Sequence, residues 1–161
     1  MTVVILSDSH GLLDYMYMAV ETIRPDAVIH LGDCWRDGVK LQERFPEIPV
    51  YHVPGNVDFG CDAPRELHLT LEGHRVMACH GDRYSVKLTL ARLEHAAREA
   101  GAELALYGHT HQAKLEKREG VTLLNPGSIG SPRQWGDFSY AVAFFHEGKP
   151  VTAYLKKIQE Y

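Results

Sequence analysis

The chain has 161 residues, of which 45% are apolar and 24% are charged, and its formal net charge is −4. This length fits one domain with an ordinary core, which needs no disulfide for stability. Because the net charge is negative, the sequence shows no basic surface typical of nucleic acid binding, and we expect no nucleic acid polymer as a partner. Bound divalent cations would nevertheless make a local site positive.

The first third of the chain alternates short apolar runs with segments of helical spacing. Val3-Val4-Ile5-Leu6 is a continuous apolar run, as expected for a parallel strand that is buried on both faces. Pro25 and Pro46 end the two helical segments. The order implies a parallel sheet with right-handed crossovers. The expected elements are strands at 3–6, 27–31 and 49–53 and helices at 14–24 and 36–45.

The rest of the chain is mostly of the β type. Residues 67–71 alternate with period two, Glu72-Gly73 forms a turn, and residues 75–79 run apolar, which predicts a hairpin. Residues 1–161 therefore form a single α/β domain, parallel at the front and antiparallel at the back. The later expected elements are a helix at 86–100 and strands at 103–107, 114–118, 121–124, 139–146 and 151–156.

The termini and cysteines bear on the compartment. The first six residues lack a basic leader, and no stretch approaches the roughly 18 apolar residues that a spanning helix needs. Cys34, Cys61 and Cys79 are odd in number and form no C-x-x-C pair, which favours free thiols in a reducing compartment. We expect a cytoplasmic protein without a membrane partner.

Five short polar clusters each follow one of the predicted strands. In open α/β sheets, ligands bind beyond the carboxyl ends of the strands, so we expect these clusters to converge on one edge. Together they supply carboxylates, an amide and four imidazoles. The clusters are Asp8-Ser9-His10, Gly32-Asp33, Gly55-Asn56-Val57-Asp58, His80-Gly81 and Gly108-His109-Thr110-His111.

Most of these clusters are ordinary when each is taken alone, because Gly-Asp and Gly-Asn are common turn dipeptides. Gly-His-Thr-His is more specific, since two histidines at this spacing after a strand have few structural uses. Carboxylate and imidazole ligands suit Mn²⁺, Fe²⁺ or Zn²⁺, whereas a Mg²⁺ or Ca²⁺ site would show oxygen ligands and a structural zinc site would show cysteines. The set is large enough for two adjacent metals, which suit displacement at phosphorus.

The ordered set of clusters resembles the calcineurin-like metallophosphoesterase superfamily, and the short chain resembles its small prokaryotic phosphodiesterase branch. The similarity spans nearly the whole length, including Asn125-Pro126-Gly127-Ser128. The resemblance implies a four-layer α/β/β/α sandwich, in which two mixed β-sheets are flanked by helices. It also implies two divalent metal ions as cofactors, with manganese favoured over iron, nickel or zinc.

The resemblance also implies a role for each ligand residue. Asp33 bridges the two metals, and Asp33, Asn56, His80 and Asp58 are the expected catalytic residues. Asp58 either orients Asn56 or a neighbouring histidine, or stabilises the turn. The remaining ligands are Asp8, His10 and His111 for the first metal and Asn56, His80 and His109 for the second.

The implied activity is that of a metal-dependent phosphoric diester hydrolase, in which a metal-bridging hydroxide attacks small phosphodiester substrates. Many relatives carry a histidine at the position of Val57, which helps to stabilise the transition state or to protonate the leaving oxygen, and valine can do neither. Small members of the branch often lack that histidine too. A phosphomonoesterase and a metal-retaining scaffold or interaction module are the alternatives. Relatives of this size often self-associate, so a homo-oligomer is compatible with the sequence.

Overall fold

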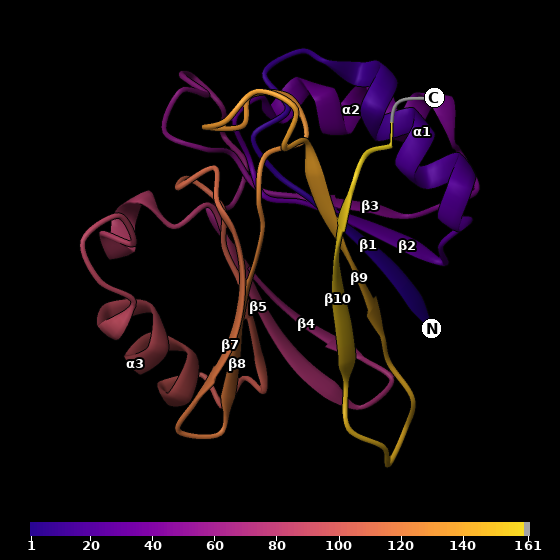
Figure 1. The fold of residues 1–161 in the computed structure, drawn as a ribbon. Helices are drawn as coiled ribbons and strands as arrows, with labels where there is room; N and C mark the ends of the chain where they lie inside the picture. Colours follow the sequence, from indigo (N-terminus) through magenta and orange to yellow (C-terminus); the bar gives the residue numbers. More distant parts are fainter. Residues whose placement is uncertain (160–161) are drawn as a thin grey trace.

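The computed structural model describes residues 1–159 and contains two β-sheets (Figure 1). The first sheet contains the amino-terminal strands. Its strand order is β10-β9-β1-β2-β3. β1, β2 and β3 are mutually parallel, while β9 and β10 add antiparallel pairs at one edge. The continuous apolar run of β1 fits this central position, because both faces of the strand are covered. The strands are β1 (Thr2–Leu6), β2 (Ala27–His30), β3 (Val50–His52), β9 (Ser139–Phe144) and β10 (Thr152–Lys157).

The second sheet is also mixed, with the order β4-β5-β6-β8-β7. β4 and β5 form the predicted antiparallel hairpin, β5, β6 and β8 run parallel, and β7 closes the edge antiparallel to β8. Both sheets therefore direct the carboxyl ends of parallel strands to an edge where loops can carry ligands. The strands are β4 (Glu66–Leu71), β5 (His74–Cys79), β6 (Leu104–Leu106), β7 (Ala113–Arg118) and β8 (Val121–Pro126).

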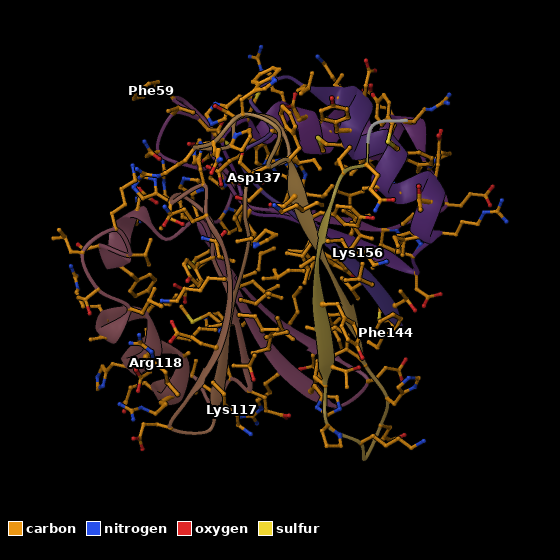
Figure 2. All side chains as sticks on the ribbon, viewed as in Figure 1. Phe59, Lys117, Arg118, Asp137, Phe144 and Lys156 are labelled. Atoms are coloured by element: carbon orange, nitrogen blue, oxygen red, sulfur yellow. The ribbon has the colours of Figure 1, made fainter. Side chains whose placement is uncertain are left out.

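In the described part of the chain, three α-helices cover the outer faces of the sheets. α1 (Leu13–Ile23) and α2 (Trp35–Arg44) pack on the first sheet, and α3 (Ala91–Glu99) packs on the second. A third apolar cluster, with Ile5 and Leu104 among its members, fills the space between the sheets (Figure 2). The predicted four-layer sandwich is thus confirmed. Within residues 1–159, no helix has the length and apolarity to cross a membrane.

The helix predicted at 86–100 is wrong over its first turns. A 3₁₀ turn at Asp82–Tyr84 is followed by Ser85 in the left-handed region (φ 54°), and the amides of Leu88 and Thr89 bond to the Ser85 carbonyl. The buried residues before and within α3 keep a helical spacing, which hid the break from a periodicity argument. The side chain of Leu88 is 87% exposed, as expected for a turn rather than an amphipathic helix.

Candidate metal centre

All seven predicted metal ligands come together in the structure, although they lie on loops that follow five different strands. The loops after β1, β2 and β3 approach from the first sheet, and those after β5 and β6 approach from the second. The carboxyl ends of these strands meet at the same end of the sandwich. The residues are Asp8 and His10 after β1, Asp33 after β2, Asn56 after β3, His80 after β5, and His109 and His111 after β6.

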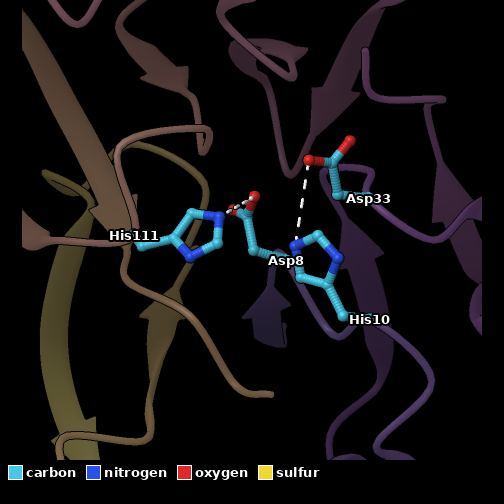
Figure 3. Close-up of side chains that lie close together, drawn as sticks. All are labelled: Asp8, His10, Asp33 and His111. Carbon is cyan, nitrogen blue, oxygen red and sulfur yellow. Dashed lines mark ion pairs between the residues drawn. The ribbon is translucent and has the colours of Figure 1, made fainter. Parts of the chain in front are cut away.

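A first ligand group contains Asp8, His10, Asp33 and His111. One ligand atom from each lies within 4.8 Å of all the others (Figure 3). His111 Nε2 is 3.1 Å from Asp8 Oδ1, and His10 Nε2 is 3.9 Å from Asp33 Oδ2. Two carboxylates and two imidazoles at this spacing can hold one divalent cation.

A second ligand group contains Asp33, His80 and His109, again with ligand atoms within 4.8 Å of one another. Asn56 joins them, because its Oδ1 lies 3.0 Å from His80 Nε2. His80 Nε2 also lies 3.4 Å from Asp33 Oδ2 and 3.2 Å from His109 Nδ1. Asp33 belongs to both groups, so it occupies the position that a bridging ligand would need.

Backbone carbonyls fix the orientation of two of the histidines. His80 Nδ1 donates to the Leu31 carbonyl at 2.7 Å, and His111 Nδ1 donates to the Ser131 carbonyl. Because a carbonyl can only accept, each Nδ1 carries the proton and each Nε2 turns toward the centre. This pairing of a ligating histidine with an outer acceptor is typical of metal sites.

The charges at the centre fit a cation. Asp8 is fully buried, and its Oδ1 accepts no hydrogen bond from residues 1–159, while Oδ2 accepts from Ser7 Oγ at 2.5 Å and from the His109 amide at 3.1 Å. Burial raises the pKa of Asp8, but contacts with His111, His80 and Ser7 outweigh burial and lower it overall. A divalent ion would satisfy a buried carboxylate oxygen that faces imidazole nitrogens without a hydrogen bond.

The pKa of His80, which lies beside the Asp33 carboxylate, is raised, whereas that of Asp8 is lowered. Burial lowers the pKa of His80, but contacts with Asp33 and Asp8 and with the Leu31 carbonyl outweigh burial and raise it overall. Burial likewise raises the pKa of Asp33, and contacts with His80, Val57 and His10 lower it overall. The site therefore favours ionised carboxylates beside a positive charge, and a metal supplies that charge more strongly than a proton.

The ligand loops adopt an uncommon backbone. Among residues 1–159, nine non-glycine residues have positive φ angles, and five of them are predicted ligands. A non-glycine residue in the left-handed backbone region reduces the stability of the fold by roughly 1–2 kcal/mol. Such residues cluster at sites where function requires a particular backbone geometry. The surrounding contacts must therefore hold these loops in place. The five are Asp8 (φ 54°), His10 (φ 46°), Asp33 (φ 47°), His109 (φ 68°) and His111 (φ 57°).

Two glycines are required by close approach rather than by turn chemistry alone. A Cβ on Gly55 would lie 1.9 Å from Asp33 Oδ1, and a Cβ on Gly108 would lie 2.0 Å from Ser7 Oγ and 2.7 Å from Asp8 Oδ2. Even alanine would collide with a predicted ligand at either position. The interpretation of these clusters as ordinary turn dipeptides is therefore incomplete.

The Asp58 carboxylate accepts hydrogen bonds from backbone amides and from no ligand side chain. Its Oδ2 accepts from the Gly55 amide at 2.8 Å and the Asp33 amide at 3.1 Å, and its Oδ1 accepts from the Trp35 amide at 2.8 Å. It thereby joins the loops after β2 and β3 and caps the start of α2. These bonds match the turn-stabilising role, and they include no contact with Asn56 or with a histidine.

A buried chain of hydrogen bonds that sequence reasoning missed supports the loop after β1. The Gly32 amide donates to His30 Nδ1 at 3.2 Å, so His30 Nε2 carries the proton and donates to Ser9 Oγ at 2.9 Å. Ser9 Oγ in turn donates to Asp37 Oδ2 at 2.6 Å. Burial lowers the pKa of His30 to about 4, so it is neutral. Asp37 carried no signal in the sequence, because an acid on a predicted helix is usually exposed.

The Asn-Pro-Gly-Ser segment supports the other ligand loops. Asn125 Nδ2 donates to the Gly108 carbonyl at 3.0 Å, and Ser128 Oγ donates to the Asp8 carbonyl at 2.8 Å. Both side chains are fully buried. This segment thus connects the β6 loop to the β1 loop.

Comparison with known proteins agrees with this geometry. Residues 1–148 match the model of the calcineurin-like phosphoesterase superfamily domain. A relative from Bacillus subtilis (strain 168), named probable metallophosphoesterase YsnB, is 37% identical over 145 residues, which cover 88% of this chain and 83% of that protein.

Solved structures share the fold. A conserved uncharacterized protein from Streptococcus pneumoniae TIGR4, described as a predicted phosphoesterase, superposes with a TM-score of 0.76 at 28% identity, covering 96% of this chain and 97% of the other. Vacuolar Protein Sorting 29 from Cryptosporidium parvum superposes with a TM-score of 0.80 at 18% identity, covering 99% and 92%. The second likeness concerns the fold alone.

Proposed function

Because the chain belongs to the calcineurin-like phosphoesterase superfamily, a family that uses divalent metals, we propose that it is a dinuclear metal-dependent phosphodiesterase for small substrates. The observation that carries the proposal is the pair of ligand groups that share Asp33. Asp8, His10 and His111 would hold one ion, Asn56, His80 and His109 would hold the other, and manganese is the metal we favour.

Ions bound in these groups would activate a water molecule for attack on phosphorus and neutralise the charge on the phosphoryl oxygens. The protein holds the ligands in position beforehand. Carbonyls orient His80 and His111, Asp58 ties the loop of Asp33 to that of Asn56, and buried Ser128 secures the loop of Asp8. The neutral amide of Asn56 limits the negative charge, so an anionic substrate can still approach.

A diester is favoured over a monoester by the residue next to Asn56. The Val57 side chain is 44% exposed beside the centre, and it can neither donate nor accept a proton. General acid catalysis contributes roughly 10²–10⁴ in rate where it operates, so we expect this enzyme to prefer esters with good leaving groups. Space for two substituents around the phosphorus supports the same choice, because two separate pockets adjoin the ligand loops.

The test is turnover of bis(p-nitrophenyl) phosphate and of p-nitrophenyl phosphate by protein loaded with Mn²⁺. We expect the diester to be hydrolysed with the higher kcat/KM. The Asp33→Asn protein, checked for folding by circular dichroism, is the control for contaminating activity. A higher kcat/KM for the monoester would contradict the diester assignment and would favour a phosphomonoesterase.

A scaffold or interaction module remains the second candidate, because the same fold occurs in a protein named for vacuolar sorting. The complete ligand set favours the enzyme. If the protein binds two metals and hydrolyses neither ester with any divalent ion, the scaffold is the better description.

A further inference from the structure

Of the pockets that adjoin the candidate metal centre, a small one of about 150 Å³ is lined by His80, and the two larger ones share no lining residue. One, of about 440 Å³, includes the ligand His111 in its wall. The other, of about 630 Å³, is lined by Cys34 and Val57, which directly follow Asp33 and Asn56. Figure 3 shows His111 and Asp33, the ligands nearest in sequence to the two pocket walls, on either side of Asp8.

The pocket beside His111 carries two cations, Arg133 and Lys156, that make no ion pair within residues 1–159. Arg133 Nε donates to the Thr110 carbonyl at 2.9 Å, which fixes the side chain against the loop that holds two ligands. Within residues 1–159 Arg133 makes no ion pair, whereas its neighbour Lys157 is paired with Asp137 at 2.5 Å. The terminal nitrogens of Arg133 are therefore free to bind an anionic group.

The pocket beside Val57 offers aromatic surface instead. The Trp35 ring in its wall is stacked on His52, with centroids 4.6 Å apart and planes at 10°. Phe59 is 91% exposed and projects from the edge of the molecule (Figure 2).

The charged side chains in the wall of the Val57 pocket provide no excess positive charge for an anion. Arg36 and Asp62 contribute one charge of each sign. The Asp58 carboxylate is occupied by three backbone amides. This pocket therefore suits an uncharged flat group rather than an anion.

We propose that these two pockets select unsymmetrical diesters, with a flat aromatic substituent in the Val57 pocket and an anionic substituent beside Arg133. This inference rests on the proposed function. Both volumes lie in the range of small-molecule sites, and each pocket is next to a ligand of the centre. A substituent on a phosphorus atom held there would enter one pocket, and the other substituent would enter the second.

A binding experiment tests the aromatic pocket without turnover. The chain has two tryptophans, so in a Trp135→Phe background the fluorescence reports Trp35 alone. We expect phenyl phosphate to perturb this signal and to bind the Mn²⁺-loaded protein about 2- to 12-fold more tightly than propyl phosphate. Phe59→Ser should remove the difference, while Tyr154→Ser, which changes an exposed aromatic residue on β10, should preserve it.

A kinetic experiment tests the cationic pocket. We compare p-nitrophenyl 2-carboxyethyl phosphate with p-nitrophenyl propyl phosphate, which share a leaving group and differ in one carboxylate. The carboxylate should lower KM by about 2- to 5-fold. Arg133→Gln should reduce this preference, and Arg133→Gln combined with Lys156→Gln should abolish it. Arg92→Gln, on α3 and outside both pockets, should leave it unchanged.

The results separate this inference from the proposed function. Equal affinity for phenyl and propyl phosphate, or variants without effect on either preference, would overturn the two-pocket inference even if diesters are hydrolysed. Absence of turnover from protein that binds phenyl phosphate preferentially would overturn the proposed function, and would support the aromatic pocket alone.

Discussion

Replacing Gly55 by alanine should disrupt the centre without removing a single ligand. The added Cβ would lie 1.9 Å from Asp33 Oδ1 and 2.6 Å from the Asp33 amide nitrogen, against 3.4 Å for ordinary contact. The carboxylate oxygen must therefore move by about 1.5 Å, whereas metal–ligand distances tolerate only about 0.2 Å. The backbone cannot move freely, because the amides of Gly55 and Asp33 both donate to Asp58.

The expected cost follows from these contacts. Overpacking typically costs about 1–3 kcal/mol, and each hydrogen bond to the Asp58 carboxylate that is lost adds about 1.5–3 kcal/mol. A total near 3 kcal/mol corresponds to a fall of roughly 6–12 °C in Tm for a chain of this size. The loss of metal should be larger than the loss of stability suggests, since Asp33 belongs to both ligand groups.

The assay combines thermal unfolding with metal analysis on protein kept well below its Tm. Gly60→Ala is the matched control, because Gly60 is also on the loop after β3, has φ +71°, and a Cβ there meets no atom within 4 Å. That substitution should cost roughly 1–2 kcal/mol and leave the metal content unchanged. A Gly55→Ala protein with wild-type Tm and wild-type metal content would refute the role assigned to this close approach.

Three further outcomes are expected. Asp33→Asn should lower kcat/KM for bis(p-nitrophenyl) phosphate by at least about 100-fold, and wild-type activity at saturating metal would exclude Asp33 as the bridge. Val57→His should raise kcat/KM for alkyl esters, by up to about 100-fold, more than for nitrophenyl esters, and an unchanged leaving-group dependence would exclude a missing acid at this position. The hydrogen bond to Glu103, and to a smaller extent the one to the His146 carbonyl, raises the pKa of His74 above 6.5. The pair of His74 and Glu103 therefore stabilises the fold fully below about pH 6.5, and this stabilisation is lost as pH rises through the raised pKa of His74. Glu103→Gln should therefore lower the free energy of unfolding by about 0.2–1 kcal/mol at pH 6 and by less at pH 9, and an equal loss at both pH values in urea titrations would contradict this.

The strand ends could be predicted from the sequence because they depend on local patterns. A continuous apolar run followed by a polar cluster marks a buried parallel strand and its loop, and β1 with Asp8 and β2 with Asp33 follow this rule. The four-layer arrangement came from the resemblance rather than from periodicity.

The supporting contacts could not be predicted, because they join residues that are distant in sequence. Asp37 looks like an exposed helical acid until the fold places Ser9 beside it, and Ser128 bonds to Asp8 across 120 positions. The role of Gly55 depends on the distance between two loops, which no local pattern encodes. The start of α3 was missed because the apolar spacing continues through the turns before it.

Metal content per chain tests the dinuclear centre most directly. Protein purified without chelator, reloaded with Mn²⁺ and freed of excess ions, should contain two divalent ions per chain by mass spectrometry. Asp33→Asn should retain one or none. A folded wild-type chain that takes up no divalent cation would contradict the assignment of these seven side chains as ligands.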